Sequence, residues 1–138
     1  MKKRLPLCPS AQPHMQDSTV FGIIGGTAQE PCTIYLNEPQ TFSKVSHLSG
    51  PVKATEVFRI AAKCAEHNCL HFDGTRCRLA QKVVDLEPAI ESLAPCPIRV
   101  DCKWWQQEGK EACLRCPFIV TEHYNPSEEL RLAADPKF

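Results

Sequence analysis

Nine cysteines are the residues of this chain best suited to chemistry. Seven of them fall into two groups between residues 64 and 116. The first group is Cys64, Cys69 and Cys77, and the second is Cys96, Cys102, Cys113 and Cys116. Thiols this close together in sequence can pair as disulfides, hold a metal ion or cluster, or act as nucleophiles.

Disulfide pairing is disfavoured by the start of the chain and by the cysteine count. The opening MKKRLPLCPSAQP has prolines and polar residues where a signal peptide needs an apolar run of about 7 to 15 residues. We therefore expect a cytoplasmic protein, in which clustered thiols stay reduced and more often bind metal or catalyse. The odd total of nine also leaves a thiol unpaired in any scheme made only of disulfides.

The spacing of the seven cysteines favours a cluster over a single zinc ion. Zinc sites are usually built from two close pairs of ligands, and only Cys113 and Cys116 form such a pair here. An iron-sulfur cluster is larger and accepts thiolates from several loops and helix ends, so uneven spacing is tolerated. Zinc remains the alternative cofactor.

Two Cys-Pro steps, Cys96-Pro97 and Cys116-Pro117, add to this hypothesis. The second step closes the run CLRCP, and a cysteine followed by proline also ends the ligating run of bacterial ferredoxins. In these features the chain resembles iron-sulfur cluster-binding proteins in general. The resemblance implies one or two 4Fe-4S clusters as the cofactor.

The first group has three cysteines and needs a further ligand to complete a site. His67 and His71 lie inside that group, and either imidazole could replace a thiolate. Cys32, in an expected strand, could also supply the further ligand. Cys8 is flanked by a proline in the amino-terminal arm and is not expected to be a ligand.

The sequence predicts an α+β fold: a small N-terminal antiparallel β element followed by a cysteine-rich helical metal-binding region. The runs FGIIGGT and PCTIYLNEP predict two antiparallel strands. Apolar spacing predicts helices over 55–65 and from Cys77 onward, a third through KWWQQEG, and a further turn at KEACLRC. PFIVTEHY predicts a strand. The expected divisions are a flexible arm (1–19), the β element with a connector (20–54), the metal-binding region (55–124) and a polar tail (125–138).

The composition bears on function through charge. Lysine plus arginine and aspartate plus glutamate number 16 each, so nucleic-acid binding is not indicated, and no apolar run has the roughly 20 residues that cross a bilayer. No cysteine has a recognisable paired base, so catalysis is not favoured. We expect electron transfer or redox sensing with a redox or enzyme partner protein. The alternatives are a zinc-stabilised module that interacts with protein or nucleic acid and a cluster-bearing accessory subunit of an enzyme.

Overall fold

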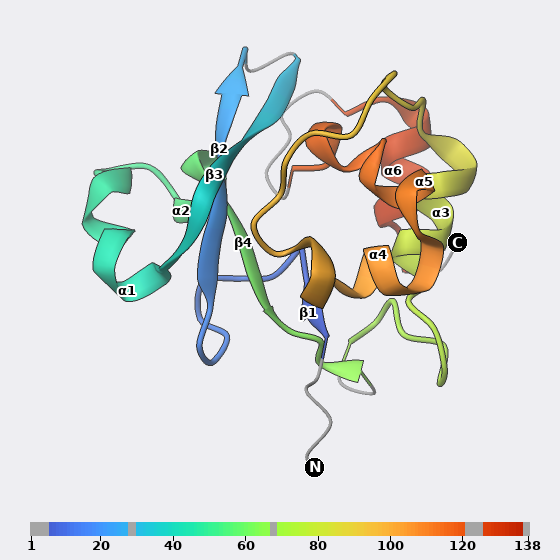
Figure 1. Cartoon of the computed structure of the whole chain (residues 1–138), viewed down its shortest axis with the longest axis horizontal. Helices are drawn as coiled ribbons and strands as arrows, with labels where there is room; N and C mark the ends of the chain where they lie inside the picture. Colours follow the sequence, from blue (N-terminus) through green and yellow to red (C-terminus); the bar gives the residue numbers. More distant parts are fainter. Residues whose placement is uncertain (1–5, 28–29, 67–68, 121–125, 137–138) are drawn as a thin grey trace.

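The computed structural model describes residues 6–27, 30–66, 69–120 and 126–136. It confirms a mixed α+β fold, in which an antiparallel sheet packs beside a group of helices (Figure 1). The four strands lie in the order β1-β4-β2-β3. Their bounds are Leu7–Cys8 (β1), Thr19–Gly26 (β2), Pro31–Thr41 (β3) and Phe58–Lys63 (β4).

The helices form two groups on opposite sides of the strands (Figure 1). Two single-turn helices, α1 (Phe42–Val45) and α2 (Ala54–Val57), lie in the connector between β3 and β4. The larger group is α3 (Arg78–Leu86), α4 (Lys103–Glu108), α5 (Lys110–Cys113) and α6 (Glu128–Ala134). None of the helices in the described ranges has the length and hydrophobicity needed to cross a membrane.

The predicted strand pair is confirmed as β2 and β3. The pairing runs from Thr19 opposite Thr41 to Gly26 opposite Pro31, with an irregularity between Val20 and Gly22. A Cβ atom at Gly22 would lie 2.5 Å from the Thr33 side chain, so only glycine lets the strands approach this closely.

The helix predicted over 55–65 is wrong, because most of this segment is the strand β4. Residues Phe58 to Ala62 are all buried, and the strand pairs with β1 on one edge and β2 on the other. An apolar run buried on both faces has no alternation to distinguish it from a buried helix. Cys64 therefore leaves the end of an inner strand instead of the last turn of a helix.

The part of the amino-terminal segment that the structure describes, from residue 6 onward, contains packed residues where a flexible arm was expected. Leu7 and Cys8 form β1 and pair with Lys63 and Ala62 of β4. Ala11 is also buried, and its N–H donates to the Ile60 carbonyl at 3.0 Å. The pairing is between residues more than fifty positions apart, so local composition gave no sign of it.

The helices predicted in the second half are confirmed as α3, α4 and α5. Cys77 is the N-cap of α3, and its sulfur accepts a hydrogen bond from the Ala80 N–H at 3.5 Å. Cys102 is the N-cap of α4, and Gly109, at a φ of 68°, ends that helix. The interior of this half is a single cluster in which Cys77, Cys102 and Cys116 pack with Trp104. The cysteines are thus part of the core.

The chain after Cys116 differs from the strand expected at PFIVTEHY. Residues Cys116–Phe118 form a 3-10 helix, residues 119 and 120 belong to no strand, and 121–125 lie outside the described ranges. The polar tail forms α6, which is capped by Ser127 and buries Leu130 and Ala133.

Arg59, the second residue of β4, joins three segments of the chain. It is 1% exposed, and its Nε donates to the Pro9 carbonyl at 2.9 Å. Its Nη1 donates to the Cys116 carbonyl at 2.7 Å and to Thr33 Oγ1 at 3.2 Å. The guanidinium also lies 5.2 Å from the Phe21 ring centroid. Within the described residues no carboxylate forms an ion pair with this buried cation.

Replacing Arg59 with lysine tests this junction. An ammonium group cannot reproduce the fork that reaches Pro9, Thr33 and Cys116 together. We expect the free energy of unfolding to fall by about 1.5 to 3 kcal/mol, the size of hydrogen bonds to a charged group. Chemical denaturation measures it, with the exposed Arg131→Lys as the matched control. Equal free energies of unfolding for Arg59→Lys and Arg131→Lys would contradict this role of Arg59.

Candidate metal centres

Eight of the nine cysteines divide between two cavities, and all nine are free thiols. Site A is lined by Cys96, Cys102, Cys113 and Cys116. Site B is lined by Cys8, Cys64, Cys69 and Cys77. The remaining thiol, Cys32 on β3, lines neither cavity.

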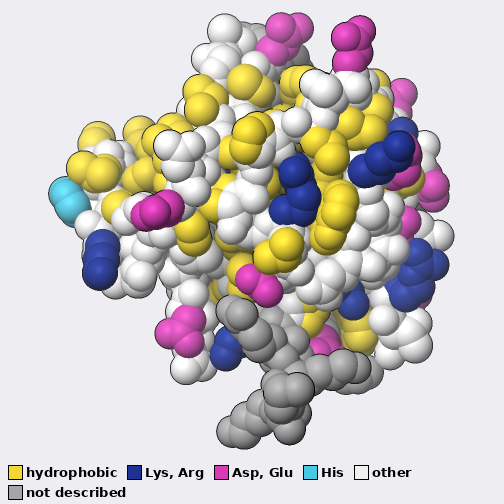
Figure 2. All heavy atoms as spheres, in the orientation of Figure 1, with side chains coloured by type: hydrophobic (Ala, Val, Ile, Leu, Met, Phe, Trp, Pro, Cys, Tyr) yellow, Lys and Arg dark blue, Asp and Glu magenta, His cyan; other side chains and the backbone are white. Residues whose placement is uncertain are grey.

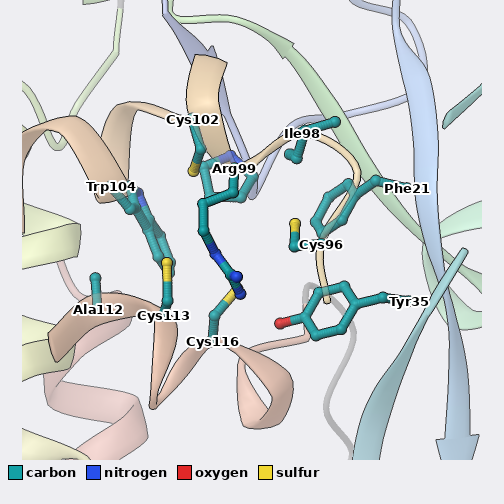
Figure 3. Close-up of a pocket in the computed structure, with 11 residues that line it drawn as sticks. Phe21, Tyr35, Cys96, Ile98, Arg99, Cys102, Trp104, Ala112, Cys113 and Cys116 are labelled. Carbon is teal, nitrogen blue, oxygen red and sulfur yellow. The ribbon is translucent and has the colours of Figure 1, made fainter. Parts of the chain in front are cut away.

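Site A lies between the sheet and the helices (Figure 3). Cys96 and Cys102 stand on either side of a short 3-10 helix, Arg99–Asp101, whereas Cys113 ends α5 and Cys116 begins the next turn. Side chains from the sheet and from α4 and α5 complete the wall, namely Phe21, Tyr35, Trp104 and Ala112. Four thiols therefore reach one enclosure from four chain positions.

The centre of site A is occupied by the Arg99 side chain, and the remaining cavity is about 10 Å³ (Figure 3). Burial raises the pKa of Cys113, whereas a hydrogen bond from Arg99 lowers it. Burial also raises the pKa of Tyr35, and the neighbouring Cys116 adds to this rise. Arg59 holds the Cys116 backbone from the other side. Two guanidinium groups thus lie close to the thiols of site A.

Site B is a cavity of about 270 Å³ between the amino-terminal segment, the end of β4 and the start of α3. Lys63 and Lys103 line it with the four thiols, and the Lys103 Nζ lies 6.0 Å from the Phe72 ring centroid. Burial raises the pKa of Cys8 to about 12, and the thiols of Cys77, Cys64 and Cys69 add to the rise.

Backbone N–H groups favour the thiolate form at both sites. In each case the donor lies two or three residues after the cysteine: Ser10 for Cys8, Leu79 and Ala80 for Cys77, Ile98 for Cys96, Trp104 and Trp105 for Cys102. Burial still dominates, and it raises the pKa of Cys102 to about 12. Donors placed this way reduce the cost of negative charge on a metal-bound sulfur.

The seven cysteines predicted as ligands all line one of the two sites. His71 lines site B, and burial together with Lys82 and Arg78 lowers its pKa. His67 lies outside the described residues.

Cys8 was not expected among the site residues, yet it lines site B. It is the fourth thiol at that cavity, where His67, His71 or Cys32 was considered as the further ligand. A signal was present, because Cys8 precedes Pro9, the same Cys-Pro step that marked two residues of site A.

Buried polar atoms without a hydrogen-bond partner gather at these sites. Five side-chain nitrogen or oxygen atoms in the described ranges are buried and unpartnered. Four of them are Arg59 Nη2, Arg99 Nε, Trp104 Nε1 and His71 Nδ1. A buried polar atom left without a partner costs about 1 to 3 kcal/mol.

The thiols of the two sites do not converge on a common point. Among the described residues, no three cysteine, histidine, aspartate or glutamate side chains are arranged to hold a metal ion. A tetrahedral zinc ion requires sulfurs about 2.3 Å from a common centre. The thiols would therefore have to move to bind a single ion, and at site A the Arg99 side chain would have to move as well.

Comparison with known proteins gives no further assignment. No family model matches the sequence, and no curated protein or solved structure is similar to it. The chemistry of the two sites is therefore the basis for a functional proposal.

Gln107 of α4 offers a test of how site B is held. Its side-chain amide accepts from the Cys77 N–H and donates to the Cys77 carbonyl, both at 2.8 Å. We expect Gln107→Ala to weaken metal retention at site B by roughly 10- to 100-fold, the usual effect of losing an outer-sphere partner. Competition with a chelator measures the retention. The neighbouring, exposed Gln106→Ala is the control, and equal retention by both variants would contradict the assignment.

Proposed function

We propose that this chain is a small iron-sulfur protein with two 4Fe-4S clusters, one in site A and one in site B, that transfers electrons to or from a partner protein. The observation that carries the proposal is the division of eight cysteines into two sets of four around separate cavities. Four thiolates are the complete ligand set of such a cluster.

The surroundings of both cavities support clusters of net negative charge. Arg59 and Arg99 lie at site A, and Lys63 and Lys103 line site B. Backbone donors to sulfur and a largely apolar wall are features that tune the reduction potential of a cluster.

Electron transfer is favoured over catalysis because each set supplies a thiolate for every iron of a cubane cluster. No iron would then keep an open position for a substrate. This argument also favours a carrier or redox sensor over an accessory subunit that binds substrate through its cluster.

A redox partner could approach the surface near site A. Val100 and Phe118, each two residues from a site A cysteine, are 77% and 41% exposed, and Ile34 on the edge strand β3 is 59% exposed. The face of the molecule seen in Figure 2 carries hydrophobic side chains with lysine and arginine side chains among them. Free thiols and clusters of this kind are suited to the reducing cytoplasm.

Metal and sulfide analysis of protein purified without oxygen tests the proposal. We expect roughly eight iron and eight sulfide ions per chain, the content of two 4Fe-4S clusters, and a brown colour. Colourless protein with stoichiometric zinc and no sulfide would overturn the proposal and favour the zinc-stabilised interaction module.

Serine substitutions test the ligand sets individually. We expect Cys8→Ser and Cys113→Ser each to reduce the iron content by about half, because each removes one ligand from one of two clusters. Cys32→Ser is the matched control and should keep the full content. Full iron in Cys8→Ser would remove Cys8 from site B.

A further inference from the structure

One side chain, Trp104, forms part of the wall of both cavities. It is 1% exposed and belongs to the first turn of α4. The residue two positions before it, Cys102, is a thiol of site A, and the residue between them, Lys103, lines site B. The two sites are therefore separated at this point by a single buried indole.

The backbone also joins the two sites directly. Leu7, which precedes Cys8 of site B, forms a parallel bridge with Cys102 of site A. Arg59 donates to the carbonyls of Pro9 and Cys116, which both line site A, and the two neighbours of Pro9 in sequence, Cys8 and Ser10, line site B. The walls of the two sites are therefore joined through the backbone.

We propose that the two centres act as one coupled pair, with Trp104 as the medium through which an electron passes between them. The inference rests on the proposed function, since it requires a cluster in each site. With a cluster held by the four thiols of each site, an external one-electron donor would supply the electron, and the Trp104 indole would lie on its path from one site to the other. Only the electron would be transferred, with no covalent bond formed or broken.

The electrostatics predict a measurable interaction. Reducing one centre adds a negative charge close to the other, and the buried environment screens it weakly. The second electron should therefore enter at a lower potential than the first. The two paramagnetic reduced centres should also interact magnetically because they are adjacent.

Electron paramagnetic resonance of the reduced protein tests the coupling. We expect partly reduced protein to give the simple spectrum of one centre, and fully reduced protein to give a spectrum broadened and split by interaction of two spins. In a variant lacking site B, Cys8→Ser with Cys64→Ser, the splitting should be lost. Cys32→Ser should retain it.

The outcomes separate the two proposals. If the protein holds no iron and sulfide, the proposed function fails. If the full iron and sulfide content is present but the fully reduced spectrum is the sum of two independent centres, the coupled pair is wrong and the proposed function stands. Comparing the spectra of partly and fully reduced wild-type protein tests the coupling even if the double variant does not fold.

Variants of Trp104 test the path itself. Trp104→Phe keeps an aromatic ring in the shared wall, whereas Trp104→Leu removes it. We expect electron redistribution after partial reduction by a pulse-generated viologen radical to be slower in Trp104→Leu than in Trp104→Phe at equal iron content. Equal rates in the two variants and the wild-type protein would show that the indole is not the medium.

Discussion

The structure depends on a buried positive charge, Arg59, whose hydrogen-bond partners come from three parts of the chain. A buried cation is strongly unfavourable unless an opposite charge or sufficient acceptors surround it. Carbonyl and hydroxyl oxygens provide part of that compensation. Because one of these acceptors is the carbonyl of Cys116, the same side chain joins the sheet to the backbone of a site A cysteine.

The parts of the fold that local patterns control could be predicted from the sequence. The β2–β3 pair follows from two β-favouring runs joined by a glycine turn, and α3 follows from apolar residues at helical spacing. Gly109 marks the end of α4, as a glycine with positive φ commonly does. Of the eight cysteines at the two sites, seven could be identified because they are grouped in sequence.

The predictions that were wrong concern parts of the fold that depend on contacts between residues distant in sequence. β4 is buried on both faces and so lacks the alternation of a half-exposed strand, and the apolar residues in and around it have a three- and four-residue spacing that also fits a helix. Cys8 was set aside because its neighbours predict an irregular arm, yet pairing with β4 places it beside Cys64 and Cys77. The Cys8-Pro9 step was the one local sign that Cys8 resembles Cys96 and Cys116.

The central claim is that two separate sets of four thiols hold two clusters. Native mass spectrometry of the anaerobically purified chain tests it most directly, since it reports the number and composition of bound groups in single molecules. The account predicts the mass of the polypeptide plus two 4Fe-4S clusters. A mass matching the polypeptide with zinc ions, or with a single cluster as the highest loaded state, would contradict it.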